Sequence, residues 1–373
     1  MEVVDSVVKQ VCGTRGCNDT NMSCSVIAMV KKAFCCLLAI GSICVCLSMT
    51  GCSQSSNTET RAIAATLTDG TNIYEDDVSD YIDTYRQHNQ LEDDDTWNQA
   101  LEQSNYSSDV FRTMTIYELA AKSIIADEAA NDGITITDDQ INDAITQQKQ
   151  ALGVNDDDTW NQMLDTYGID AGSFWDTIAY RLKEEAVYKD AVSQSSASDD
   201  QALSYLTSNY GGTTAHYMQC ISNTSTSTLS TAYDQLEAQS STLDSAGFSS
   251  YVQTYSDKAC TDNADGSLGW DIQYGSSSDI ASVFTSMQAN ELYGDMYTFG
   301  DGEKGILFCG QTFDIPTTLS DTSSVPSTLL SYARKQASTV QWNKDCKAWL
   351  QQQIEDSITI NDMPDGLAYA TDK

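Results

Sequence analysis

A histidine and an aspartate frame the part of the chain with the clearest potential for chemistry. His216 lies in the apolar stretch 215–221, and Asp257 follows a stretch, 248–256, with helical spacing. An imidazole and a carboxylate can orient or polarise an amide through hydrogen bonds and proton transfer. Apolar side chains on the following loop and helix could exclude water from such an amide, and they are Leu268, Trp270, Ile280 and Phe284. We therefore expect a candidate site within 215–313.

The elements that must position these side chains form a unit of about a hundred residues, a common domain size. A short apolar strand near 215–221 is followed by two helical segments and by a Gly-rich loop at 265–270. A further helix and an apolar strand at 305–313 complete it. The order of elements predicts an α+β fold.

The cysteines and histidines do not favour a metal site. The chain has 12 cysteines but only 2 histidines, and the cysteines after residue 52 are widely spaced, without a Cys-x-x-Cys pair. Outside a membrane these four could form up to two disulfides, and free buried thiols are equally open. They are Cys220, Cys260, Cys309 and Cys346. We expect no metal and no cofactor.

A repeat with an offset of 63 residues organises the region before the candidate site. Residues 70–82 align with 133–145, and the sequence Asp-Asp-Asp-Thr-Trp-Asn-Gln occurs at both 93–99 and 156–162. Each copy predicts an N-capped amphipathic helix, a short helix carrying a tryptophan, and a long third helix, 108–131 or 171–192. The Asp runs are expected to cap helices, because they lack the spacing of a calcium loop.

Residues 29–52 have the pattern of an export signal. Lys31 and Lys32 precede the apolar run 33–49, and Gly51-Cys52 is followed by a polar stretch. This ending resembles the lipobox of bacterial lipoproteins, which implies that Cys52 is the lipidated residue of the mature chain. An uncleaved anchor helix and a buried helix remain as alternatives, since the run is borderline in length for a membrane span. We interpret residues 1–28 as an over-long gene start.

The charge of the chain limits its partners. The formal net charge is −35, almost all of it located after residue 51. A polyanion would be repelled, so we expect no nucleic-acid partner. The same charge keeps a chaperone-like surface soluble, although an acidic solvated surface without function is the plainer reading.

The candidate site resembles a parvulin-type peptidyl-prolyl isomerase domain. The resemblance rests on His216 at the start of a strand, on Phe248 with Tyr255-Ser256 at a helix end, and on the loop Gly-Ser-Leu-Gly-Trp at 266–270. It implies a proline pocket with His216 and Asp257 as catalytic residues. The family pattern departs at Gly305, where a second histidine is expected, and at Lys258, where a Cys or Asp is usual.

The preceding helical region is similar to the N-terminal chaperone domains of SurA and PrsA, on the residues Gly-Ile-Thr-Ile-Thr-Asp-Asp-Gln-Ile at 133–141. This resemblance implies an α+β protein whose mainly helical chaperone domain, completed by a long C-terminal helix, carries an inserted small antiparallel-sheet domain. The expected ranges are 1–28 before the signal, 29–51 signal, 52–69 tether, 70–211 helical domain with repeats 70–123 and 133–186, 212–316 parvulin-like domain, 323–360 C-terminal helix and 361–373 loose tail.

The implied function is that of a lipid-anchored foldase outside the bacterial cytoplasmic membrane. Its partners would be unfolded or newly secreted polypeptides. Because two polar positions of the pattern are missing, isomerase activity is expected to be weak or absent. The alternative is a surface adhesin or a solute-binding lipoprotein, the latter requiring a parallel sheet that the helical repeat does not favour.

Overall fold

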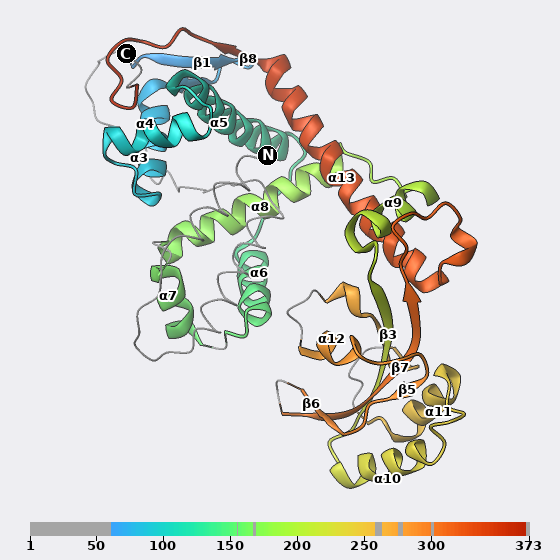
Figure 1. Ribbon diagram of the computed structural model, residues 1–373. Coiled ribbons are helices and arrows are strands. Elements are labelled where there is room, and N and C mark those ends of the chain that lie inside the picture. Colours follow the sequence, from blue (N-terminus) through green and yellow to red (C-terminus); the bar gives the residue numbers. More distant parts are fainter. Residues whose placement is uncertain are drawn as a thin grey trace. The chain divides into compact units, whose positions relative to one another are not determined.

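The computed structural model describes residues 61–154, 156–166, 169–257, 263–274, 279–299 and 302–370. Its contacts divide the chain into two units (Figure 1). The first unit contains the described residues up to Ser193 and those from Asp345 onward, and the second contains Gln194–Lys344. A mainly helical unit therefore carries an inserted unit with an antiparallel sheet, which confirms the predicted α+β class.

The first unit contains a three-stranded antiparallel sheet in the order β2-β1-β8. Its strands are β1 (Ile63–Leu67), β2 (Asn72–Tyr74) and β8 (Ile358–Ile360). β8 lies within the range 323–360 that was expected to be helical, and it pairs with β1. The prediction of a polar tether over 52–69 is wrong for residues 63–67. These residues form β1, and Ala64, Ala65 and Leu67 are buried in the core.

Six helices of the first unit form the two predicted repeats. The first comprises α3 (Glu75–His88), α4 (Asp94–Gln103) and α5 (Ser108–Asn131), and the second α6 (Asp138–Ala151), α7 (Asp157–Thr166) and α8 (Ala171–Ala191). The Asp runs cap helices as expected. Asp93 accepts hydrogen bonds from the amides of Asp95 and Thr96, and Asp156 accepts one from the amide of Thr159 at 2.7 Å.

The two copies share their aromatic packing. Trp97 meets Phe111 edge-on at a centroid distance of 5.0 Å, and Trp160 meets Phe174 in the same way at 5.1 Å. These are favourable geometries for aromatic pairs, beyond the area that they bury. The sequence repeat is therefore also a repeat of core structure.

A cation lies over each tryptophan at the equivalent position. The Arg86 guanidinium is 5.6 Å from the Trp97 ring, and the Lys149 ammonium is 5.5 Å from the Trp160 ring. Each cation also pairs with the first aspartate of the following helix, Arg86 with Asp94 at 2.9 Å and Lys149 with Asp157 at 2.7 Å. The ion pair fixes the turn between the first and second helix of each copy.

The C-terminal part departs from expectation in two ways. The predicted helix is present as α13 (Ser327–Ser357), but Leu329 and Ala333 belong to a core of the second unit, and only its later residues, such as Ile354, to the first. Both ends of the helix carry apolar stripes, so it serves both cores. The tail is also not loose, because Tyr369 is fully buried in the first core.

The second unit is built on a five-stranded antiparallel sheet in the order β4-β3-β7-β5, with β6 also paired to β7. The strands are β3 (Thr214–Ser222), β4 (Ser267–Trp270), β5 (Glu291–Leu292), β6 (Tyr297–Thr298) and β7 (Lys304–Asp314). Ile221 and Phe308 on one face pack with α10 (Thr226–Glu237) and α11 (Ser245–Tyr255). The opposite face packs with α12 (Asp279–Phe284).

The second unit extends beyond the expected range 212–316. It also contains α9 (Asp199–Tyr210), whose N-cap is Ser198, and the first part of α13. Leu203 and Leu206 of α9 share a buried cluster with Trp270 and Ile315. The sheet therefore needs these flanking helices to cover its apolar residues.

Three further expectations concern covalent and membrane features. Cys220 is disulfide-bonded, while Cys309 and Cys346 are free and buried. Within the described ranges no helix combines the length and apolarity needed to cross a bilayer. Residues 1–60, which include the expected signal and Cys52, lie outside the described part, as do Lys258 and Cys260.

Candidate functional site

The predicted His216 forms a buried pair with an aspartate that was not predicted. Its Nδ1 lies 2.7 Å from Oδ2 of Asp271, and both side chains are almost fully buried. The Asp271 carboxylate also accepts hydrogen bonds from the amides of His216 and Ile272, at 2.9 Å and 2.8 Å. Asp271 begins a short turn of helix, η1 (Asp271–Gln273), directly after β4. These hydrogen bonds fix the imidazole on β3, next to the end of β4.

The pair determines how the imidazole can act. A carboxylate only accepts hydrogen bonds, so Nδ1 carries the hydrogen and Nε2 is the atom available to a ligand. No hydrogen bond joins Nε2 to any described residue. His216 can therefore orient or polarise a group bound beside it, provided that the ligand reaches Nε2.

Cys309 lies close to this pair but is a poor nucleophile. It occupies β7 opposite Met218, the next residue after His216 on the same face of β3. Burial, helped by the carboxylates of Asp271 and Glu291, raises the pKa of the Cys309 thiol to about 12. The thiol therefore remains protonated at neutral pH, and thiolate chemistry is not expected here.

Gly305, the position where the resemblance implied a second histidine, is not beside His216. Gly305 pairs with Ser222, whereas His216 pairs with Thr312 at the other end of the strand. Six residues of β3 separate the two positions, about 20 Å at the usual rise. A Cβ at Gly305 would also meet the ring of Phe299 at 2.7 Å. A histidine at this position would neither fit nor reach the pair.

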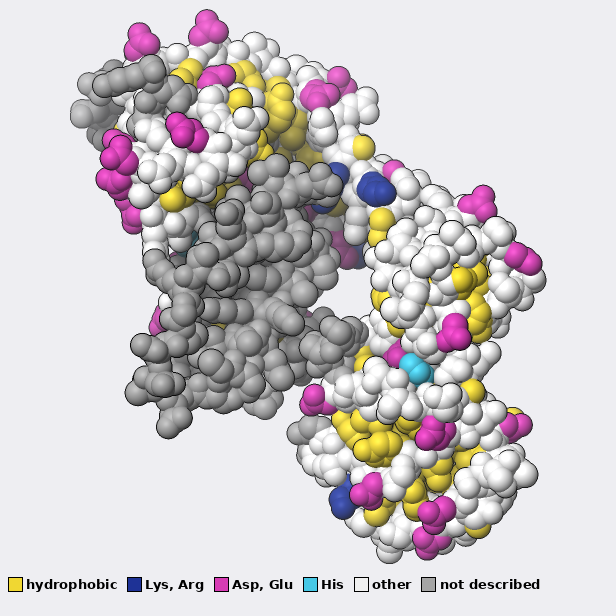
Figure 2. Space-filling view, in the orientation of Figure 1, with side chains coloured by type: hydrophobic (Ala, Val, Ile, Leu, Met, Phe, Trp, Pro, Cys, Tyr) yellow, Lys and Arg dark blue, Asp and Glu magenta, His cyan; other side chains and the backbone are white. Residues whose placement is uncertain are grey.

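Three of the four expected pocket residues come together on one face of the sheet. Phe284 is fully buried in a cluster with Met218 and Cys309, and Leu268 and Ile280 pack against it half-buried. Other half-buried members are Val283, Tyr293, Tyr297 and Phe299. Figure 2 shows an apolar area over α12 and the adjoining strands of this unit. The face could bind an apolar group.

The fourth expected residue, Trp270, lies elsewhere. Its ring is buried against Tyr217 at 5.4 Å, and its indole nitrogen donates to Thr328 at 3.1 Å. It belongs to the cluster that contains residues of α9 and α13. In this structure Trp270 is a core residue, and it does not line the face that carries Phe284.

Asp257, the second expected catalytic residue, is also remote from His216. Its carboxylate accepts hydrogen bonds from the Thr224 amide at 3.1 Å and from the Thr224 hydroxyl at 2.7 Å. Thr224 follows the end of β3, whereas His216 is near its start. Asp257 therefore fixes a connection between β3 and α10, and Asp271 provides the carboxylate beside the histidine.

Asp271 and Cys309 are the residues that sequence reasoning missed. The only available signal for Asp271 was its place directly after the Gly-Trp of the loop. Nothing in the sequence showed that it would meet His216, from which it is separated by 55 residues. Among the described residues, no group of three or more acidic, histidine or cysteine side chains could hold a metal ion.

The two units define a class of protein in which a duplicated helical fold carries an inserted antiparallel unit, and β3 and η1 of that unit hold a buried His–Asp pair. Residues 26–187 match the family model described as the SurA-like N-terminal domain. This part of the chain is therefore similar to SurA-like N-terminal domains. No curated protein matches the chain significantly.

Several solved structures are similar to the chain over most of its length. PrsA from Bacillus subtilis is 13% identical over 80% of this chain and 93% of its own, with a TM-score of 0.35. A structure of the Campylobacter jejuni SurA-like chaperones PEB4 and Cj1289 is 13% identical over 80% and 99%, with a TM-score of 0.36. The foldase PrsA from Lactococcus lactis is 13% identical over 81% and 95%, also at 0.36. Since these TM-scores are below 0.5, the functional proposal does not depend on them.

Proposed function

We propose that this protein is a chaperone that acts outside the cytoplasmic membrane and binds unfolded or newly secreted polypeptides. The observation that carries the proposal is the SurA-like N-terminal domain at residues 26–187. The strongly acidic chain, of net charge −35, supports it by keeping a client-binding protein soluble and attracting basic client segments. Client binding is expected to depend on the first unit.

The second unit would act as a parvulin-like domain with weak or absent peptidyl-prolyl isomerase activity. Isomerisation requires rotation about a partly double bond with a barrier of about 18–20 kcal/mol. An apolar face that excludes water from the amide lowers this barrier without covalent chemistry. Leu268, Ile280 and Phe284 would supply that face, and His216 would be the one orienting group. Among the described residues, Cys309 does not supply a second orienting group, because it is a buried neutral thiol.

The test compares wild type with His216→Ala in two assays, suppression of aggregation of an unfolded client and isomerisation of a proline peptide. His88→Ala is the matched control, because His88 is an exposed residue of α3 in the other unit. We expect measurable suppression by all three proteins and a low isomerase rate that His216→Ala hardly changes. A positioned acid or base typically accelerates a reaction about 10²- to 10⁴-fold. An isomerase domain that lacks one such group should therefore be slower by a factor of that order.

Two results would contradict the proposal. A high isomerase rate that collapses in His216→Ala but not in His88→Ala would show a working enzyme with one histidine. Absence of client binding in the full chain would remove the chaperone role and favour the adhesin alternative. The solute-binding alternative gains no support, because every strand pair in the described residues is antiparallel.

The proposed location depends on lipidation of Cys52. The apolar run 33–49, Gly51-Cys52 and the polar residues after it support this assignment. Mass spectrometry of membrane-extracted protein should find a diacylglyceryl group on an N-terminal Cys52, and Cys52→Ala should release the protein from the membrane. Equal membrane retention of the variant would contradict the anchor.

A further inference from the structure

Two exposed carboxylates border the apolar face of the second unit. Asp279 is the residue before Ile280 on α12, and Glu291 of β5 is paired with Cys309 of β7. Directly paired residues of an antiparallel sheet lie on the same side, so Glu291 is on the side that carries Cys309. Figure 2 shows acidic side chains beside the apolar area of this unit. A group bound on this face therefore lies close to negative charge.

An aromatic ring lies near the first of these carboxylates. Tyr297 of β6 packs half-buried on the same cluster as Ile280, and its ring meets that of Phe299 edge-on at a centroid distance of 5.0 Å. Burial, followed by the charge of Asp279, raises the pKa of the Tyr297 hydroxyl, so the carboxylate is close enough to act on the phenol. The face of a neutral phenol ring attracts cations. A positive charge placed here would interact with both groups.

The second unit offers few cations of its own for this position. No described cation forms an ion pair with Asp279. Residues 214–314 contain 13 Asp and Glu residues, two lysines and no arginine. Lys304 pairs with Thr298, the residue after Tyr297, and therefore points to the other side of the sheet. Within the described part of the chain, the ring and the carboxylate thus lack the positive charge that both attract.

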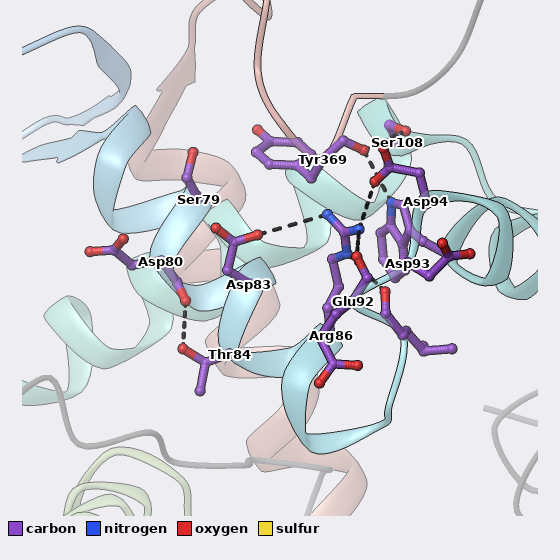
Figure 3. Close-up of polar contacts among 12 residues, drawn as sticks. Ser79, Asp80, Asp83, Thr84, Arg86, Glu92, Asp93, Asp94, Ser108 and Tyr369 are labelled. Carbon is purple, nitrogen blue, oxygen red and sulfur yellow. Dashed lines mark hydrogen bonds and ion pairs between the residues drawn. The ribbon is translucent and has the colours of Figure 1, made fainter.

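The first unit shows how this chain holds a cation between an aromatic ring and a carboxylate. The Arg86 guanidinium lies 5.6 Å from the Trp97 ring and 2.9 Å from the Asp94 carboxylate, and Figure 3 shows its pair with Asp94. Two further groups of this kind are Arg61 with Tyr74 and Asp76, and Lys149 with Trp160 and Asp157. The ring and the carboxylate attract the same charge, and the cation stays partly in solvent.

We propose that the apolar face of the second unit selects polypeptide segments in which an arginine or lysine is next to the proline that the face binds. The cation of the client lies over the ring of Tyr297 and pairs with Asp279, while Glu291 adds to the attraction. This selectivity rests on the proposed client binding by the parvulin-like unit and specifies the chemistry of those clients. Arginine binds better than lysine, because its guanidinium is planar and more weakly hydrated.

The first experiment measures binding of three fluorescent peptides to the full chain at low ionic strength. The peptides differ in one residue, which precedes a central proline and is arginine, leucine or glutamate. The arginine peptide should bind at least about fivefold more tightly than the glutamate peptide, because a cation–aromatic contact and an exposed ion pair each change affinity about two- to fivefold. Raising the salt concentration to about 0.5 M should reduce the difference.

The second experiment locates the selectivity on the protein. Asp279→Asn should lower the ratio of the arginine to the glutamate affinity at least about twofold and leave the affinity for the leucine peptide unchanged. The matched control is Asp234→Asn, which removes an exposed carboxylate from α10 on the opposite side of the sheet and should keep the wild-type ratio. Tyr297→Phe should keep the ratio and Tyr297→Leu should lower it, because the ring is lost in the second variant. If Tyr297→Leu fails to fold, the exposed Asp279 still provides the test.

The possible outcomes separate this selectivity from the proposed function. Equal affinities for the arginine and glutamate peptides, or an equal fall of the ratio in Asp279→Asn and Asp234→Asn, would overturn the selectivity. Binding of the leucine peptide in that case would leave the apolar site intact. If none of the three peptides binds, the face is no client site, and the selectivity fails with the parvulin-like role. Suppression of aggregation by the same protein would then assign client binding to the first unit.

Discussion

At the residue scale, the ion pair between Arg112 and Glu75 is the contact most sensitive to a single change. The Arg112 side chain is 1% exposed and donates two hydrogen bonds to Glu75, one of them at 3.2 Å. Removing one partner leaves a buried charge unpaired, so Arg112→Met should lower the free energy of unfolding by about 3–5 kcal/mol in urea denaturation. The double variant with Glu75→Gln should recover much of the loss.

An exposed pair provides the control for this prediction. Lys189 and Glu185 lie 2.7 Å apart on one turn of α8, and both are more than half exposed. Lys189→Met should cost less than about 0.5 kcal/mol, because solvent screens such pairs. Comparable losses in Arg112→Met and Lys189→Met would contradict the role assigned to burial.

Glu184 predicts a dependence of stability on pH. Burial raises the pKa of this carboxyl above its ordinary value of 4.5, and nearby Glu118 adds to the increase, against a hydrogen bond from Tyr188 and the charges of Arg181 and Lys347. The folded state thus binds the proton more tightly than the unfolded state. The stabilisation is fully present below the unfolded pKa and is lost as pH rises through the folded pKa.

Glu184→Gln should remove this contribution. Thermal unfolding followed from pH 4 to pH 8 should give a variant whose stability relative to wild type increases as pH rises. Glu185→Gln is the neighbouring control, since Glu185 is exposed on the same helix. Parallel pH profiles for wild type and Glu184→Gln would contradict the assignment.

The residue-scale predictions from sequence succeeded where local pattern decides the position. His216 was found because it opens an apolar strand, but its partner depended on how β4 pairs with β3, which residue spacing does not reveal. Trp270 was assigned to the pocket because it lies beside Leu268 in the sequence. Side chains two apart on a strand share a face only where the strand is regular, and a register shift interrupts the pairing of β3 with β4.

At the element scale, the repeat offers a matched pair of substitutions. Trp97 and Trp160 each pack edge-on against a phenylalanine and lie under a cation, and Trp97 also contacts Tyr85 at 6.4 Å. Of the two, Trp97 donates to a carbonyl of the tail. Trp97→Phe should therefore lower the free energy of unfolding by about 1 kcal/mol more than Trp160→Phe, the usual value of one hydrogen bond. Equal losses in chemical denaturation would show that the tail contact contributes nothing to stability.

Helices were more predictable than the cores to which they belong. α5 and α9 begin directly after a serine cap, as their sequences indicate, because a cap is a local contact within three residues. The division of α13 between two cores could not be predicted in this way. An amphipathic stripe shows that a helix is covered, but it does not show by which segment.

At the scale of the whole molecule, the second unit should fold by itself only with its flanking helices. A fragment of residues 194–344 retains α9 and the part of α13 that covers Trp270, and it should unfold cooperatively. A fragment of residues 212–316 lacks both and exposes Trp270, Ala215 and Ile315. Calorimetry should show a lower melting temperature for the shorter fragment, and equal melting temperatures would contradict the wider boundary.

The pairing of β1 with β8 determines the order in which a growing or exported chain can fold. Ala65 pairs with Ile360, so the sheet of the first unit is complete only when residue 360 has emerged. The second unit is encoded between them and can finish earlier, because its contacts close within residues 194–344. During synthesis β1 therefore remains unpaired until β8 has emerged. A pause in synthesis or export near residue 344 would lengthen the time during which β1 is unpaired.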